Sequence, residues 1–362
     1  MKIPHLRKQT EKKNCHGYSW EDDYSWIHQD NCLEILRDTK KLNPEVRKYL
    51  EEENSYTKEI MRDTENLQKK IFKEIEGRIK LDDESLPFKD KKYNYWTKTT
   101  KKGNYSKKLR KKIGSDKVEC YFDGDLEAKG KKFFSTGDLA VSNNDEFLAF
   151  SVDDKGGEYF TIFVRRISDN KIIEKIEDTA GGIVWSYDDK SFFYRKHDSQ
   201  KRPRKILQHR LGSPSKEDIL IFEETDERFT CSIDTTSCEK YYTIETSEHT
   251  TSETYYFHKD EKKFEPKLVL KREDGILYSL DSFDGYWYIH TNKDAEDFKI
   301  LRCPNDKMND WKDFVPAKSG TLIGGLTFLK KWIIRSEISN ALSKGFVRNL
   351  ETCLLYTSPS PR

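Results

Sequence analysis

The side chains that could bind a metal or act as nucleophiles lie far apart in this 362-residue sequence. Its eight histidines include no pair four residues apart, the spacing that puts two ligands on one helix face. Its seven cysteines form no CxxC pair and have no histidine at metal-ligand spacing, a pattern typical of reduced thiols. The cysteines are Cys15, Cys32, Cys120, Cys231, Cys238, Cys303 and Cys353. We therefore predict no metal site, no cofactor and a reducing compartment, by default the cytoplasm.

One basic cluster, KKGNYSKKLRKK from Lys101 to Lys112, has the composition of a phosphate-binding patch. It follows the strand-like YNYW across a Gly103-Asn104 turn, so the solvated outer half of a β-hairpin explains it more simply. Over the chain, 66 basic side chains balance 64 acidic ones. Charge therefore predicts neither a nucleic-acid nor a membrane-surface partner. No apolar run reaches the length of a membrane helix, and the charged first residues predict no secretory signal.

A helical segment comes first among the elements that must position any site. Asn43 followed by Pro44 predicts a helix start, with a side-chain cap and a proline whose missing N–H costs nothing there. The apolar residues that follow keep helical spacing up to Gly77, which predicts one long amphipathic helix or two in sequence. They are Val46, Tyr49, Leu50, Tyr56, Ile60, Leu67, Ile71 and Ile75. We interpret this stripe as a packing surface without chemistry.

From about Tyr93 onward the apolar period changes to two, which predicts short half-buried strands. The clearest runs are Tyr93 to Trp96, Phe147 to Phe150, Phe192 to Tyr194, Tyr241 to Ile244 and Tyr286 to Ile289. A phrase that first reads LAVSNNDEFLAF returns as IVWSYDDKSFFY, FTCSIDTTSCEKYYTI, LYSLDSFDGYWYI and, loosely, GLTFLKKWII. Its polar anchors are Ser142, Ser186, Ser232, Ser279 and Thr327. Their steps of 44 to 48 residues are typical of four-stranded propeller blades, and the alternative is a β-sandwich with coincidental spacing.

Three stretches resemble the prolyl oligopeptidase group of serine peptidases (peptidase family S9, subfamily A). HGYSWEDDYSWIHQDN, from His16 to Asn31, resembles the group's HGxxRxDxYxWL opening, with Trp20 in place of the arginine. PEVRKYLEEENSYT resembles its PEVxxYLxxENxY helix, and RPRKILQHRLGSPSKEDILIFEE resembles RPxxVxxHxLGTxxxxDxLxxEE, with Ser213 in place of the threonine. Arg202-Pro203 and the YSLD that ends at Asp281 favour the oligopeptidase B branch over the post-proline enzymes.

The resemblance implies a mainly β fold: an incomplete seven-bladed propeller, preceded by a helical arm that packs on an α/β-hydrolase domain missing from this chain. Residues 1–77 would be the arm, 78–352 the partial propeller, and 353–362 a tail. The implied activity is cleavage of short peptides after Arg or Lys, with the propeller limiting access to the site. The implied partners are those peptides and the missing catalytic domain.

No catalytic residue can be carried over from the group to this chain. A serine peptidase of this kind needs a GxSxG elbow, followed in chain order by Asp and His. Gly212-Ser213 and Gly114-Ser115 lack the second glycine, so we assign them no role. His209 lies in the blade phrase, where a structural hydrogen bond is expected. Glu223 and Glu224 have the charge to attract a basic side chain, but a solvated face explains them equally well.

The last ten residues, CLLYTSPSPR, resemble a translated sequencing adapter and no propeller strand. We therefore expect the native protein to continue past about Glu351, with the catalytic triad downstream. Five recognisable blades, with a poorer strand set around Tyr93 to Phe122, would not close a ring. Expressed as written, the chain is expected to aggregate or stay partly unfolded, without peptidase activity. The competing hypotheses are a post-proline enzyme and a freestanding propeller that binds a partner, although the latter leaves the helical arm unexplained.

Overall fold

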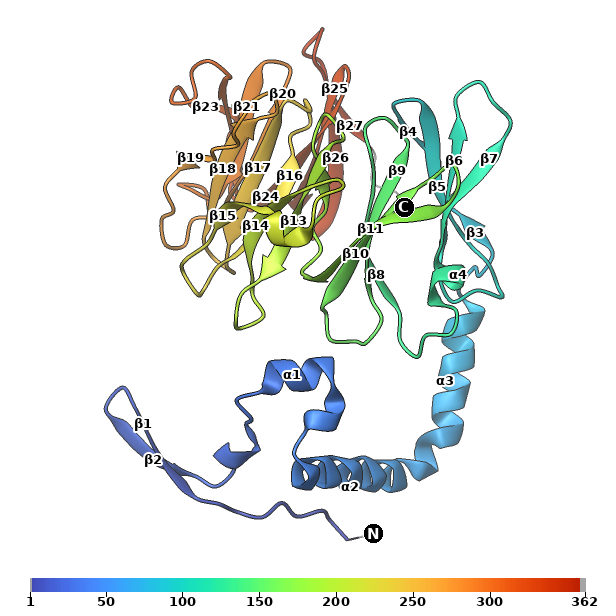
Figure 1. Ribbon diagram of the computed structural model, residues 1–362. Helices are drawn as coiled ribbons and strands as arrows, with labels where there is room; N and C mark the ends of the chain where they lie inside the picture. Colours follow the sequence, from blue (N-terminus) through green and yellow to red (C-terminus); the bar gives the residue numbers. More distant parts are fainter. Residues whose placement is uncertain (1, 359–362) are drawn as a thin grey trace. The chain divides into compact units, whose positions relative to one another are not determined.

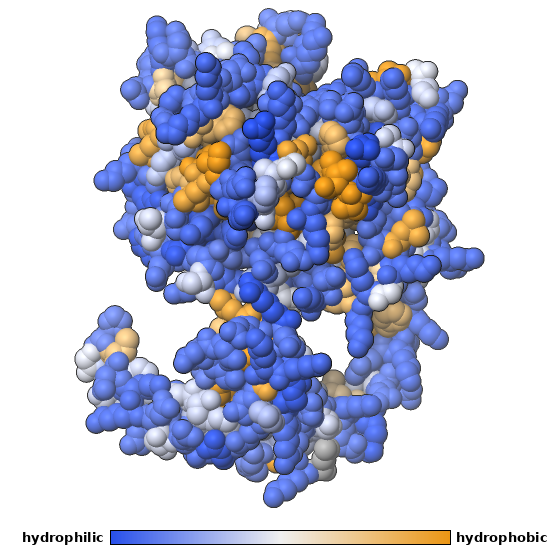
Figure 2. All heavy atoms as spheres, viewed as in Figure 1, coloured by the Kyte–Doolittle hydropathy of each residue, from blue (hydrophilic) through white to orange (hydrophobic). Residues whose placement is uncertain are grey.

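The computed structural model describes residues 2–358 (Figure 1). Its contacts divide the chain into two compact units. The first contains Met1–Thr136 and Asp153–Tyr159, and the second contains Gly137–Val152 and Phe160–Arg362. The face shown in Figure 2 is mostly hydrophilic with scattered apolar patches, as a mean hydropathy of -0.91 leads one to expect.

The first unit starts with a hairpin and three helices. These are β1 (Glu11–Cys15), β2 (Tyr18–Asp22), α1 (Cys32–Arg37), α2 (Pro44–Ile60) and α3 (Glu65–Gly77). The Asn43 side chain accepts a hydrogen bond from the Glu45 backbone N–H at 2.8 Å, so the predicted helix start is confirmed. A 3-10 turn at Arg62–Thr64 separates α2 from α3. Of the two alternatives, one long helix or two in sequence, the structure therefore shows two helices. The second helix ends at Gly77, as predicted.

The apolar stripe along α2 and α3 is mostly uncovered. Val46 is buried, but Leu67, Ile71 and Ile75 are 57%, 46% and 56% exposed, and Phe72 beside them is 65% exposed. Charged side chains are ordinary on a helix surface, whereas a run of large exposed apolar side chains is typical of an interaction surface or of one that favours aggregation.

The strands that follow form six antiparallel sheets. The first, in the first unit, contains β3 (Asp83–Glu84), β4 (Phe88–Asp90), β5 (Tyr93–Thr99), β6 (Lys107–Lys112) and β7 (Val118–Asp123), with the short helix α4 (Gly124–Ala128) after it. The next two are β8 (Ser135–Val141), β9 (Phe147–Asp153), β10 (Phe160–Arg166) and β11 (Lys171–Thr179), then β12 (Val184–Trp185), β13 (Ser191–His197), β14 (Pro203–Arg210) and β15 (Ile219–Glu223).

The last three sheets have the same plan. They are β16 (Thr230–Thr235), β17 (Tyr241–Ser247), β18 (Ser252–His258) and β19 (Lys267–Leu270); β20 (Tyr278–Phe283), β21 (Tyr286–Thr291), β22 (Lys299–Pro304) and β23 (Lys312–Val315); and β24 (Thr321–Leu329), β25 (Trp332–Ser339), β26 (Leu342–Asn349) and β27 (Leu355–Ser358). Each of these sheets keeps chain order from one edge to the other, which is the up-and-down meander of a propeller blade.

The core of the second unit lies between consecutive sheets. Phe193 and Ile206 of one sheet pack with Ile233, Tyr242 and Phe257 of the next. The aromatic and β-branched residues predicted as strands supply this packing because alternate side chains reach opposite faces. All five predicted strand runs are confirmed; they lie in β5, β9, β13, β17 and β21.

The number of blades corrects the sequence-based expectation. After the first hairpin the described residues form six sheets, and seven blades are not supported. The physical reason is the length of the repeat: steps of about 44 to 50 residues place one five-stranded and five four-stranded sheets between residues 83 and 358. The poorer strand set around Tyr93 to Phe122 is a full sheet, the first of the six.

Three of the five predicted repeat anchors lie inside strands: Ser232 in β16, Ser279 in β20 and Thr327 in β24. Ser142 and Ser186 each start a turn in which the backbone N–H donates to a carbonyl five residues on, at Phe147 and Ser191. The same bond in the next sheet starts at Thr236, not at Ser232, which lies inside β16. The error at Ser232 arose because the FTCSIDTTSC phrase offers two polar positions four residues apart.

The basic cluster from Lys101 to Lys112 does form a hairpin with β5, as predicted. Its second half, β6, is not an outer strand, because β7 pairs with its other edge. Arg110 is 4% exposed, bonds the Glu119 carboxylate at 3.0 Å and stacks on the Tyr93 ring. The lysines of the cluster are exposed or half-buried, as a solvated lysine face requires, and Arg110 alone among its basic residues packs inward.

The expected tail at residues 353–362 lies partly outside the described residues, which end at 358. Within them, Leu355–Ser358 pairs with β26 as the fourth strand of the last sheet. The expectation that this segment lacks a strand is wrong, while its adapter origin stays a prediction.

Candidate functional site

His209 makes the structural hydrogen bond that its place in the blade phrase predicts. Its ring is 1% exposed, and Nδ1 lies 2.7 Å from Oδ1 of Asp218. The Tyr194 hydroxyl donates to the other oxygen of that carboxylate at 2.8 Å. The second ring nitrogen, Nε2, lies 3.7 Å from the Glu174 carboxylate of the neighbouring sheet. His209 therefore faces a carboxylate on each side, where a catalytic histidine would face a serine hydroxyl.

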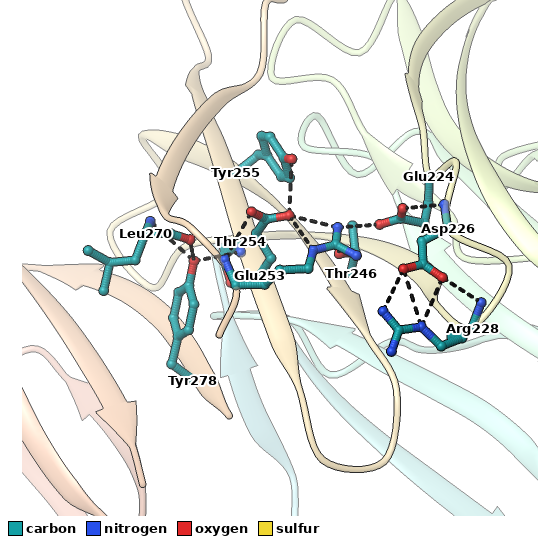
Figure 3. Close-up of polar contacts among 10 residues, drawn as sticks. Glu224, Asp226, Arg228, Thr246, Glu253, Thr254, Tyr255, Leu270 and Tyr278 are labelled. Carbon is teal, nitrogen blue, oxygen red and sulfur yellow. Dashed lines mark hydrogen bonds and ion pairs between the residues drawn. The ribbon is translucent and has the colours of Figure 1, made fainter. Parts of the chain in front are cut away.

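A buried ion cluster joins two neighbouring sheets of the second unit (Figure 3). Arg272, which follows β19, contacts Glu224 at 2.6 Å and Glu253 of β18 at 2.7 Å. The two carboxylate side chains are only 4% and 6% exposed. The guanidinium also lies 4.1 Å from the centre of the Phe229 ring. Burial alone would lower the pKa of Arg272, but the bonds to both carboxylates raise it well above its usual range.

The sequence left two interpretations of Glu224: an acid that attracts a basic side chain, or an acid on a solvated face. The structure excludes the solvated face for Glu224. Glu223 pairs with Lys205 at the surface, while Glu224 points into the ion cluster. No signal in the sequence indicated this difference, because Glu224 follows the last residue of β15 and strand alternation does not extend to it. Nothing in the sequence identified Arg272, 48 residues away, as its partner.

A surface ion pair stands beside this cluster. Arg228 holds both carboxylate oxygens of Asp226, with the shortest contact at 2.8 Å (Figure 3). Hydrogen bonds from the Arg228 side chain and backbone lower the pKa of Asp226 to about 2. Both groups are solvated, so this pair orders the loop between β15 and β16 rather than forming a reactive site.

A cavity of about 310 Å³ opens among the first strands of three successive sheets, β16, β20 and β24. We call it the acidic cavity, because three carboxylates line it and, among the described residues, no lysine or arginine does. Its polar lining residues are Ser232, Asp234, Thr235, Thr243, Glu245, Ser279, Asp281, Tyr288 and His290. The second strands of two of these sheets, β17 and β21, also line the cavity.

The titratable groups of the acidic cavity show the effect of burial without a counter-charge. Burial raises the pKa of Glu245. Burial also raises the pKa of Asp281, although that carboxylate accepts hydrogen bonds from the backbone and hydroxyl of Ser237 at 2.7 and 2.6 Å. Burial lowers the pKa of His290, whose Nε2 lies 2.7 Å from the Ile323 carbonyl, so this imidazole is neutral at pH 7 and supplies no positive charge.

A second cavity, of about 410 Å³, lies between β19 and the next sheet. Its floor is apolar, with Leu270, Ile289 and Leu301, and its rim carries Lys271 and Lys299. In the described part of the chain, no group of three or more His, Cys, Asp or Glu side chains is arranged to hold a metal ion, and no helix is long and apolar enough to cross a membrane.

The sequence pattern of the family described as "Prolyl oligopeptidase, N-terminal beta-propeller domain" matches residues 4–353. The chain belongs to this family. Curated relatives include dipeptidyl aminopeptidase BI of Pseudoxanthomonas mexicana, 27% identical over 94% of this chain and 48% of the relative. They also include protease 2 of Moraxella lacunata, 29% identical over 84% of this chain and 44% of the relative. The chain thus spans about half the length of the curated relatives it matches.

Solved structures agree with this assignment to the prolyl oligopeptidase propeller family. Oligopeptidase B from Leishmania major superposes with a TM-score of 0.89 at 23% identity, covering 100% of this chain and 54% of that one. Oligopeptidase B from Trypanosoma brucei gives 0.85 at 23% identity, covering 98% and 52%. At such identities the likeness establishes the fold, and the family match establishes membership in a group of serine peptidases.

Proposed function

We propose that this chain is the propeller portion of a serine oligopeptidase that cleaves short peptides after arginine or lysine. The observation that carries the proposal is the family match over residues 4–353, in a chain that spans half of relatives named as peptidases. The propeller then limits access to a catalytic domain that this chain lacks. The basic specificity draws support from Arg202-Pro203 and from the YSLD that ends at Asp281, which resemble the oligopeptidase B branch.

The helical arm supports the proposed second domain. A self-contained propeller gains nothing from α3, whose Leu67, Ile71, Phe72 and Ile75 are each close to half exposed or more. These side chains are the surface on which the catalytic domain packs in this proposal. Because these side chains are already about half buried, covering the rest contributes about half of the 1.5–3 kcal/mol that full burial of each gives.

The cytoplasm is the proposed compartment. Among the described residues the seven cysteines are all free thiols, which suits a reducing environment. The catalytic triad is proposed to lie outside this chain, so the 362 residues alone have no peptidase activity.

The experiment is hydrolysis of three chromogenic peptides that differ only in Arg, Lys or Pro before the cleaved bond. The complete gene product is expected to cut the Arg and Lys peptides, and the 362-residue chain to cut none. Cleavage after Pro alone would establish the post-proline alternative, and hydrolysis by the 362-residue chain would refute a catalytic site outside it. A complete gene product that cuts none of the three would leave the freestanding binding propeller as the better account.

A further inference from the structure

The cavity of about 410 Å³ between β19 and the next sheet, which we call the apolar cavity, has one wall set by strand register. Thr291 of β21 pairs directly with Tyr278 of β20 on one side and with Lys299 of β22 on the other. Ile289, two residues before Thr291, pairs with Leu301 of β22. Side chains two residues apart on a strand emerge on the same face, so these five residues form one contiguous patch, and all of them line the cavity.

The Tyr278 hydroxyl holds the opposite wall, the end of β19, in place (Figure 3). It accepts a hydrogen bond from the Leu270 backbone N–H at 3.2 Å and donates one to the Leu270 carbonyl at 2.6 Å. It also accepts the Thr254 backbone N–H at 2.8 Å. Tyr278 and Ile289 are only 5% and 0% exposed. Both walls are therefore anchored in the sheets, and the volume lies in the range of about 300–1,000 Å³ that is usual for small-molecule sites.

Lys299 is a cation of this cavity without a counter-ion. Its side chain is only partly exposed, and among the described residues it forms neither an ion pair nor a side-chain hydrogen bond. The other cations deeper in the lining are neutralised, because Arg272 belongs to the buried ion cluster and Lys293 pairs with Glu273. A partly buried ammonium that lacks a carboxylate has lost hydration without gaining an ionic partner, so the site favours an anion.

The remaining lining residues indicate what kind of anion fits. Lys271 and Asp294 are both exposed and of opposite sign, so their charges cancel and one uncompensated positive charge is left at Lys299. A single carboxylate matches this charge, whereas a phosphate group brings about 1.5 to 2 negative charges at pH 7. Leu270 and Ile276 face the patch of Ile289 and Leu301 across the cavity, and such a lining suits an apolar group attached to the carboxylate.

We propose that the apolar cavity binds a carboxylate that carries an apolar body, with Lys299 as the charge partner and Leu270, Ile289 and Leu301 as the apolar contacts. Two sources share this chemistry: a fatty acid, and the C-terminal residue of a peptide that ends in an apolar side chain. The site lies within the second unit and goes beyond the proposed function, because binding there needs no catalytic residue.

The test is calorimetric titration of the complete gene product with decanoate, with N-acetyl-phenylalanine and, as a control, with decan-1-ol. The alcohol keeps the apolar chain but has no charge, so it should bind about tenfold more weakly than decanoate or worse. Octanoate, two methylenes shorter, should bind about fourfold more weakly for each methylene lost. Binding of decanoate identifies a fatty-acid site, and binding of N-acetyl-phenylalanine alone identifies a site for peptide C-termini; both outcomes support the proposal. No binding of either carboxylate, or equal affinity for decanoate and decan-1-ol, would overturn it.

Three variants locate the binding. Lys299→Met, which keeps an unbranched apolar side chain, should weaken binding of the carboxylate about tenfold, and Lys299→Arg, which keeps the charge, should retain most of the affinity. Lys262→Met is the matched control, because Lys262 is an exposed lysine in the loop before β19 and outside the cavity, so this variant should change nothing. Unchanged affinity in Lys299→Met, with folding verified by circular dichroism, would refute the site even if the carboxylate binds elsewhere. The comparison of decanoate with decan-1-ol needs no variant, so the charge requirement can fail even if Lys299→Met does not fold.

The titration does not depend on peptidase activity, so the two proposals fail separately. If the complete gene product cuts after Arg or Lys but binds neither carboxylate, only the cavity proposal falls. If a carboxylate binds through Lys299 but no peptide is cut, the cavity stands and the proposed peptidase function falls.

Discussion

Replacing Arg272 by methionine should be among the most destabilising single changes in the second unit. The substitution keeps much of the aliphatic volume but leaves Glu224 and Glu253, 4% and 6% exposed, without their common cation. Removing one partner of a buried ion pair costs about 3–5 kcal/mol, and here two carboxylates lose the same partner. The Arg272 side chain is itself 23% exposed, so water relieves part of the loss, and we expect about 4 kcal/mol. Domains of this kind have about 5–15 kcal/mol of stability in total.

Urea unfolding followed by tryptophan fluorescence measures this effect through the transition midpoint. Arg228→Met is the matched control, because the Arg228 side chain is 65% exposed and pairs with the solvated Asp226, so its midpoint should stay close to the parent's. Adding Glu224→Gln and Glu253→Gln to Arg272→Met should recover most of the loss, since neutral amides no longer need the cation. A loss below about 1 kcal/mol is typical of surface ion pairs. Such a result would refute the interpretation of Arg272, Glu224 and Glu253 as a buried ion cluster that stabilises the fold.

Substitutions at two further positions test other parts of the account. Because burial raises the folded-state pKa of Glu245 above its usual 4.5, its protonated form contributes stability that is complete below pH 4.5 and is lost as pH rises through the folded pKa. Glu245→Gln should therefore have a higher free energy of unfolding than the parent at pH 7, and this difference should disappear towards pH 4. If the parent is as stable as the variant at pH 7, or more stable, the inferred direction of the pKa shift is contradicted. Asp189 accepts hydrogen bonds from the backbone N–H groups of Asn143 at 2.6 Å and Asn144 at 2.8 Å, so it joins the first turns of two successive sheets. Asp189→Ala should cost about 1–3 kcal/mol in thermal or urea unfolding, and Asp189→Asn, which keeps an acceptor and tolerates the positive φ of 56°, should cost less. Equal losses in the two variants would mean that backbone strain, rather than the lost acceptor, sets the cost.

Local signals predicted most of the fold, because they act over a few residues. The Asn43 cap, the stop at Gly77 and the five strand runs depend on capping chemistry and on alternation, and all were found where expected. The blade count failed because it came from a family likeness and not from the length of this chain. The anchor at Ser232 failed because Thr236, four residues on, offers the same hydroxyl.

The candidate site was much harder to predict, because its residues meet only through the packing of sheets. Glu224 and Arg272 are 48 residues apart, and Asp189 reaches Asn143 across 46. Glu245 and Thr243 look like ordinary polar positions of a half-buried strand until β20 and β24 close the cavity around them. Alternation predicts which face a side chain occupies, but not what lies opposite that face.

Sequencing the gene through its natural 3′ end tests the central claim most directly. The account predicts an open reading frame that continues past about Glu351 for roughly as many residues again, with a GxSxG elbow followed in order by Asp and His. A stop codon soon after Glu351 in an independently assembled copy, or a continuation without that elbow, would contradict it.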